Sequence, residues 1–95
     1  MTIDYASVYG QLITHIVKHQ ESIIGPMAWN EAEEVPGIAL KDKTVVLTGN
    51  GKKILELLIN QYKNLFGQAS VEACKDAVKE AGVTISDKDL PDILK

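Results

Sequence analysis

The chain has 95 residues, of which 45% are hydrophobic and 24% are charged, and its formal net charge is −3. This length fits one domain that buries about two-thirds of its unfolded surface, and the composition excludes an intrinsically disordered chain. All ten basic residues are lysines, so the chain lacks the arginines that usually read guanine and phosphate. Its acidic balance also disfavours non-specific attraction to nucleic acid, and we expect no nucleic-acid partner.

Neither a membrane segment nor a secretory signal is predicted. No apolar run approaches the roughly 18 residues that a membrane-spanning helix needs. The first ten residues, MTIDYASVYG, contain an acid where a signal peptide carries Lys or Arg. The single cysteine, Cys74, has no partner for an internal disulfide, which agrees with a reducing compartment. We therefore expect a cytoplasmic protein with no membrane partner, in which Cys74 is a small, inert core residue.

A long N-terminal helix is predicted by apolar residues at helical spacing. These residues are Tyr5, Val8, Tyr9, Leu12, Ile13, Ile16, Val17, Ile23 and Ile24. Thr2 or Asp4 is suited to cap the first turn. The apolar positions span nearly half of the circumference, which is wider than the stripe of about 100° that one partner covers. Two neighbours are therefore expected on this helix, one of which can be another chain.

A short acidic helix is predicted over residues 27–34. Gly25 and Pro26 end the first helix, because proline disfavours helical geometry at the residue before it and has no amide hydrogen. Pro26 also suits the first turn of a new helix, although the acidic end of this helix opposes its dipole. Trp29 either packs into the core or anchors a partner. Packing is favoured, because a small domain usually needs its lone large aromatic in the core.

Residues 37–40 and 44–48 predict a β-hairpin. The first run is apolar, the second is rich in β-branched residues, and the polar residues 41–43 separate them. A two-stranded ribbon is marginally stable alone. It therefore has to lie against helices or gain strands from a second copy.

Two further helices follow a glycine turn. Over residues 52–66 the apolar side chains recur at intervals of three and four and share one broad face. Those of residues 71–81 lie on a different side of the projected helix, so one straight helix does not accommodate both sets. We expect a break at residues 67–69, with Ser70 as N-cap of the separate helix and Gly82 as its C-terminal cap.

The C-terminal tail predicts only short elements. Residues 83–85 suit an extended piece that edges the hairpin, and Ser86 suits the N-cap of a final short helix. The expected fold is a single domain over residues 1–95, of the α+β class and predominantly helical. It has a long N-terminal helix, a short helix, a β-hairpin, then two helices and a short C-terminal element.

The turn GNGKK, between a predicted strand and a predicted helix, is the candidate ligand site. Amides of Gly51, Lys52 and Lys53 at a helix N-terminus, together with two lysine charges, attract phosphate or carboxylate. The match to a P-loop is poor, because Val46 stands where its first glycine belongs and Lys53 where Ser or Thr binds magnesium. A solvated turn whose glycines permit positive φ is therefore favoured, and the anion site is the alternative.

A metal site is not predicted. His15 and His19 share one helical face, as a metal pair requires, but two ligands do not make a site. Glu31 and Glu34 would complete one only if the acidic helix folded back antiparallel onto the first. Both histidines border or lie outside the apolar stripe, which is typical of flank residues on an amphipathic helix. We expect neither a metal nor a cofactor.

The leading functional prediction is a non-catalytic interaction or assembly module that associates with itself or with a partner protein. The wide apolar faces of the two long helices exceed what a ribbon and two short helices cover. A homo-oligomer is expected to form about a two-fold axis through Tyr5, Tyr9, Ile13 and Val17. A different protein is also a possible partner, and the sequence does not indicate which one.

The alternative prediction is a small-ligand domain, or an enzyme, that binds an anion or phosphate at the Gly49-to-Lys53 turn. Catalysis itself has little support. A Cys-His pair would need a contact between Cys74 and histidines that lie far back in the first helix.

Overall fold

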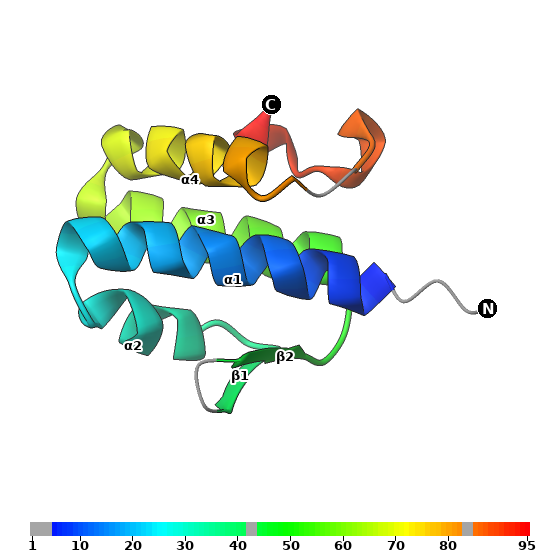
Figure 1. Cartoon of the computed structure of the whole chain (residues 1–95), viewed down its shortest axis with the longest axis horizontal. Helices are drawn as coiled ribbons and strands as arrows, with labels where there is room; N and C mark the ends of the chain where they lie inside the picture. The colour runs from blue at the N-terminus through cyan, green and yellow to red at the C-terminus, as the bar shows by residue number, and fades with distance from the viewer. Residues whose placement is uncertain (1–4, 42–43, 83–84) are drawn as a thin grey trace.

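The computed structural model describes residues 5–41, 44–82 and 85–95. In chain order the elements are α1 (Tyr5–Ile24), α2 (Met27–Glu33), β1 (Ile38–Lys41), β2 (Thr44–Leu47), α3 (Gly51–Phe66), α4 (Gln68–Glu80), and the 3-10 helices η1 (Asp87–Asp89) and η2 (Asp92–Leu94). The two strands pair antiparallel. The structure therefore confirms the predicted α+β class, its predominantly helical character and the order of its elements (Figure 1).

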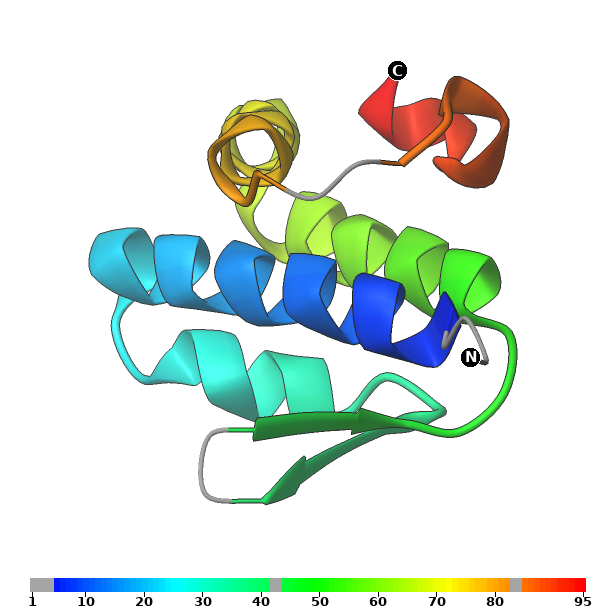
Figure 2. The ribbon, with the colours of Figure 1, turned by 45° about the vertical axis from the view of Figure 1, so that its right-hand side comes forward.

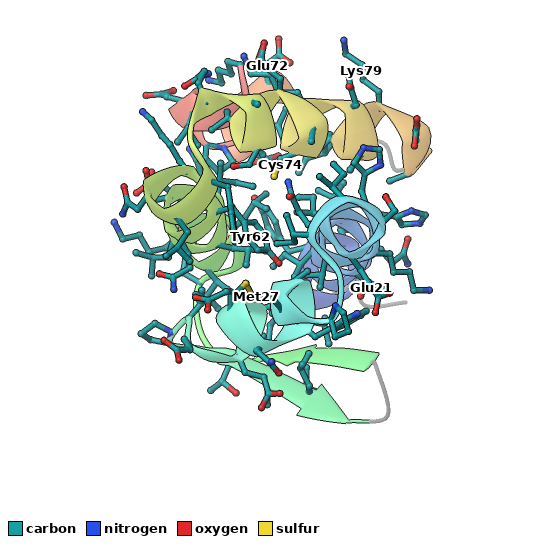
Figure 3. The ribbon with its side chains drawn as sticks, turned by 90° about the vertical axis from the view of Figure 1, so that its left-hand side faces the viewer. Glu21, Met27, Tyr62, Glu72, Cys74 and Lys79 are labelled. Carbon is teal, nitrogen blue, oxygen red and sulfur yellow. The ribbon has the colours of Figure 1, made fainter. Side chains whose placement is uncertain are left out.

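Helices α1 and α3 lie side by side in the middle of the molecule, with α4 on one side of this layer and α2 and the hairpin on the other (Figures 1 and 3). Helix α1 contacts α2, α3, α4 and β2. Four of its aliphatic side chains have no exposed surface: Leu12, Ile13, Ile16 and Val17. Neighbours from the same chain therefore cover the wide apolar face of α1.

Helices α3 and α4 are separated by a sharp change of direction at Gly67. This residue has φ 84° and ψ −172°, a combination that is essentially restricted to glycine. Its amide donates to the Lys63 carbonyl at 2.8 Å and closes the last turn of α3. The predicted break between the two helices is confirmed, and its cause is the backbone conformation of one glycine.

The predicted N-cap at Ser70 is wrong. Helix α4 begins at Gln68, so Ser70 lies inside its first turn, where it is buried. The Ser70 hydroxyl donates to the Gly67 carbonyl at 3.0 Å instead of accepting from an amide. Because the glycine turns the chain within one residue, the helix restarts earlier than the change in apolar phase indicates. Gly82, with φ 67°, follows the last residues of α4 in a left-handed conformation, as a C-terminal cap requires.

Helix α3 begins where it passes close to α1. The side-chain oxygen of Asn50 accepts from the Lys53 amide at 2.9 Å and caps the helix. A side chain at Gly51 would meet the ring of Tyr9 on α1, because its Cβ would lie 2.6 Å from Tyr9 Cγ. Glycine at this position therefore allows the two helices to approach.

The hairpin packs one face onto the helices. Its inward-facing pairs are Ile38 with Leu47 and Leu40 with Val45. Ala39 pairs with Val46 on the outer face, where both side chains are exposed. Within the described residues the sheet has only these two strands. Of the predicted edge segment, Val83 and Thr84 lie outside the described residues and Ile85 belongs to no strand.

The C-terminal segment, residues 85–95, lies beside α4 and above the layer of α1 and α3 (Figure 2). Pro91 and Leu94 of this segment are buried. A short helix follows Ser86 as predicted, but the Ser86 side chain makes no capping hydrogen bond. The segment is held to the helices by apolar packing.

Two hydrogen bonds fix the same segment to the starts of α1 and α3. The Tyr9 hydroxyl donates to the Asp89 carbonyl at 2.7 Å. The Lys52 amine donates to the Lys88 carbonyl at 2.9 Å. The C-terminal segment therefore closes one end of the helical layer.

Buried polar side chains connect the helices in the core. The Tyr62 hydroxyl, which lies between the helices in Figure 3, donates to the Ala28 carbonyl at 2.7 Å. The Gln20 amide donates to the Ser70 carbonyl at 3.0 Å and to Cys74 Sγ at 3.3 Å. Because buried polar groups are costly unless they are paired, these bonds favour one arrangement of α1, α2, α3 and α4.

Candidate interaction surface

The predicted anion-binding turn is an open hollow lined by Asn50, Lys52, Lys53 and Glu56. The side-chain amines of both lysines already have partners within the chain. Lys53 Nζ lies 3.0 Å from Glu56 Oε1, and Lys52 Nζ donates to the Lys88 carbonyl. The amide of Lys53 donates to the Asn50 side chain. Three of the groups that would bind an anion, the two lysine amines and the backbone amide of Lys53, are therefore engaged within the chain.

The structure does bring the predicted residues Gly51, Lys52 and Lys53 together at the start of α3. The lysine charges and the helix dipole attract an anion there, whereas the Glu56 carboxylate repels it. An anion on the Lys53 amide would also have to displace the cap of Asn50. The anion site therefore stays a prediction.

Among the described residues, His15 and His19 do not form a metal site with Glu31 and Glu34. His15 is exposed, and His19 Nδ1 lies 3.7 Å from Glu80 Oε2 on α4. Glu31 accepts a hydrogen bond from α3 at 2.8 Å instead. In the parts of the chain that the structure describes, no group of three or more His, Cys, Asp or Glu side chains is placed to hold a metal ion.

Cys74 and Trp29 are core residues, as the sequence analysis favours. Cys74 is fully buried, and burial raises the pKa of its thiol to about 11, although the hydrogen bond from Gln20 lowers it in part. The thiol therefore stays protonated at neutral pH, which makes it a poor nucleophile. Trp29 belongs to α2, and its side chain is 7% exposed and part of the hydrophobic core.

The predicted self-association face is wrong at the three positions whose side chains the structure describes. Tyr9 is 8% exposed, and Ile13 and Val17 are fully buried within their own chain. The side chain of Tyr5 lies outside the described ones. The physical reason is that α4 and the other neighbours of α1 cover this face, which leaves no room for a second chain.

A different set of large apolar side chains is exposed. Ile23 is 60% exposed, Met27 49%, Val46 47% and Leu65 51%. Val46 lies on the outer face of the hairpin, whereas the other three lie in the last turn of α1, at the start of α2 and near the end of α3. Figures 1 and 3 show that these three places are at the same end of the molecule. We call Ile23, Met27 and Leu65 the open end.

Hydrogen bonds between α2 and α3 place Met27 and Leu65 on the same side. The Tyr62 hydroxyl donates to the Ala28 carbonyl at 2.7 Å, and the Gln61 amide donates to a carboxylate one turn further along α2 at 2.8 Å. The two helices therefore run antiparallel. Met27 precedes Ala28 and Leu65 follows Tyr62 by almost one turn, so both extend past this bond toward the open end. In Figure 3 Met27 faces the viewer there.

The three residues of the open end lie in two stretches of chain that carry no charge. Residues 22–30 connect α1 to α2, residues 64–71 connect α3 to α4, and neither stretch contains Asp, Glu or Lys. The residues that directly flank these stretches are charged: Glu21, Glu31, Lys63 and Glu72. Glu21 and Glu72 lie at the periphery of the end view in Figure 3. The open end is therefore a set of exposed apolar side chains in uncharged stretches that charged residues of both signs flank.

Helical periodicity does not reveal this surface. It assigns Ile23 and Leu65 to the inward-facing stripes of their helices. The spacing of apolar residues identifies which side of a helix faces the core, but it does not show where along the helix the neighbouring elements end. The available signal is the lack of charge in residues 22–30 and 64–71, both at chain turns. Two separate stretches of this kind become a surface only when the fold brings them together.

Comparison of the chain with protein-family models, with curated proteins and with solved structures found no match. Over residues 5–41, 44–82 and 85–95, no helix has both the length and the apolar character needed to cross a membrane. The function is therefore inferred from the chemistry of this chain alone.

Proposed function

We propose that the protein is a non-catalytic protein-interaction module that associates with itself. The observation that supports this function is the open end, where three large apolar side chains remain about half exposed after folding. Single exposed apolar residues are ordinary on protein surfaces, whereas a group of them without charges is typical of an interaction site. Fully burying one such side chain is worth about 1.5 to 3 kcal/mol, so covering three of them favours association.

A cytoplasmic setting belongs to this proposal. Its support is the unpaired, buried thiol of Cys74, which suits a reducing compartment. The raised pKa of the buried Cys74 thiol supports the non-catalytic part, because burial holds this potential nucleophile in its protonated form.

Sedimentation equilibrium from low micromolar to millimolar concentration tests self-association. We expect the mean mass to rise from 10.4 kDa toward twice that value. Because each copy carries a net charge of −3 and the contact is apolar, added salt should strengthen the association. A mass that stays at the monomer value over the whole range would exclude this function.

The second candidate is binding of an anion or phosphate at the start of α3. The observation that favours it is the open hollow beside Lys52 and Lys53. Salt-sensitive binding of a phosphorylated ligand, with the mass constant at 10.4 kDa, would favour this candidate over self-association.

A further inference from the structure

We infer that the open end is the contact surface between two copies of this chain, which meet there about a two-fold axis. This inference rests on the proposed self-association and adds where it occurs. In a two-fold contact the same surface patch is used by both copies, so the patch has to complement itself. An uncharged apolar surface does so, because it places no like charges opposite each other.

The charge distribution argues for a second copy at this end. Each copy carries a net charge of −3, so two copies repel each other unless they meet where charge is absent. Residues 22–30 and 64–71 supply uncharged chain, and the turns that they form lie at the same end of the helical layer. Glu21 and Glu72 lie at the periphery in the end view (Figure 3), and Lys63 directly precedes residues 64–71 in the sequence.

The outer face of the hairpin is a weaker candidate for the same contact. Val46 is as exposed as Met27, but its cross-strand neighbour Ala39 is small. The sequence that connects the two strands, Lys41-Asp42-Lys43, has three charges. The hairpin therefore lacks the uncharged flanking sequence that the open end has.

The size of the open end predicts a weak dimer. Specific, stable interfaces bury about 1,200 to 2,000 Å² in total, and weak or transient ones less. The open end consists of three side chains that are each 49–60% exposed, with Ile24 and Phe66 partly buried beside them. The association is therefore concentration-dependent, and the dimer separates on dilution.

Lysine substitutions at the open end and on the hairpin locate the contact. Leu65→Lys and Ile23→Lys place a charge in the proposed contact, close to the C-terminal ends of α3 and α1, where the helix dipole favours a cation and preserves the fold. Val46→Lys is the matched control, because Val46 is exposed to a similar degree outside the open end. Each variant changes the net charge from −3 to −2, so general repulsion between copies decreases in all three.

Sedimentation equilibrium of the wild type and the three variants, with circular dichroism to verify folding, is the first measurement. We expect Leu65→Lys and Ile23→Lys each to weaken association at least about tenfold, because a buried unpaired charge is costly, and Val46→Lys to leave it unchanged. The second measurement is the concentration dependence of wild-type amide resonances. We expect the shifts to concentrate in residues 22–30 and 64–71.

The outcomes separate this inference from the proposed function. If the Leu65→Lys and Ile23→Lys variants dimerise as tightly as the wild type, the proposed location is wrong and self-association itself still stands. Loss of association in Val46→Lys alone places the contact on the hairpin and also overturns the location. A wild type that is monomeric at every concentration overturns both.

Discussion

The two ends of the helical layer differ in what covers their apolar side chains. At the end where α1 and α3 begin, the C-terminal segment lies over the helices, and Tyr9 and Lys52 donate hydrogen bonds to its carbonyls. At the opposite end, Ile23, Met27 and Leu65 remain exposed. Both ends carry apolar side chains, but only the first has a segment of the same chain to cover them.

This difference separates residues that stabilise the fold from residues that are available to a partner. An apolar side chain under the C-terminal segment contributes to the free energy of unfolding of one chain. An equally apolar side chain at the open end contributes only when another surface covers it. Substitutions at the two ends should therefore affect different measurements.

Leucine substitutions should show the largest contrast. Leu94 in the C-terminal segment is 7% exposed and Leu65 at the open end is 51% exposed. We expect Leu94→Ala to lower the free energy of unfolding by about 2 to 5 kcal/mol, because it leaves a cavity in a packed site. Leu65→Ala should change it by no more than about 0.5 kcal/mol.

Urea denaturation at low micromolar concentration, where the dimer is dissociated, measures both values. Equal losses for Leu94→Ala and Leu65→Ala would contradict the contrast between the ends. A loss for Leu65→Ala that appears only at high concentration would instead agree with it, because association then adds to the apparent stability.

Tyr9→Phe should give a smaller effect at the covered end. The substitution removes the hydrogen bond to the Asp89 carbonyl and leaves the buried ring, so we expect a loss of about 0.5 to 1.5 kcal/mol. The same contact carries a pH signature. Burial, with a smaller contribution from the nearby Asp89 charge, raises the pKa of Tyr9 above the ordinary value of a tyrosine.

The sign of the pH effect follows from which state ionises first. Above pH 10 the unfolded chain loses the Tyr9 proton while the folded chain retains it, so the stability that this group contributes falls as the pH rises through its folded pKa. The difference in stability between wild type and Tyr9→Phe should therefore shrink above pH 10. A difference that stays constant or grows would show that the phenol is not protected in the folded state.

Anion binding at the start of α3 should give the smallest effect. Because the Glu56 carboxylate lines the same hollow as Lys52 and Lys53, we expect sulfate to shift the amide resonances of Gly51 and Lys52 only weakly. Glu56→Gln should enlarge these shifts, and replacing both lysines by glutamine should abolish them. Tight, saturable binding by the wild type would favour a ligand-binding function over self-association.

Most of the elements could be predicted because their signals are local. The period of apolar residues predicts α1 and α3, a β-branched run predicts β2, and the change of phase near Gly67 predicts the break before α4. The cap assignment at Ser70 is wrong, because the φ and ψ of Gly67 determine where α4 restarts, and the apolar phase does not record them. The side chain of Asn50 caps α3, and the sequence analysis missed this cap although an asparagine before a helical pattern is a recognised cap signal.

The candidate surface could not be predicted in the same way. The wide stripe of α1 correctly indicates several neighbours, but the prediction that Tyr9, Ile13 and Val17 meet a second chain is wrong, because the neighbours belong to the same chain. Met27 and Leu65 belong to different helices, and only the antiparallel packing of α2 on α3 carries both toward one end. The spacing of apolar residues within one helix does not show how two helices pack on each other.

The sequence by itself determined the number and order of the main helices and strands, which side of each long helix is apolar, and that residues 22–30 and 64–71 are uncharged. These properties depend on interactions between residues a few positions apart, which periodicity and composition record directly. Only the tertiary structure decided that the C-terminal segment covers the start of α1 and that Ile23, Met27 and Leu65 remain exposed together. Burial depends on contacts between residues distant in the chain, such as Tyr9 with Asp89, and the packing of whole elements determines these contacts.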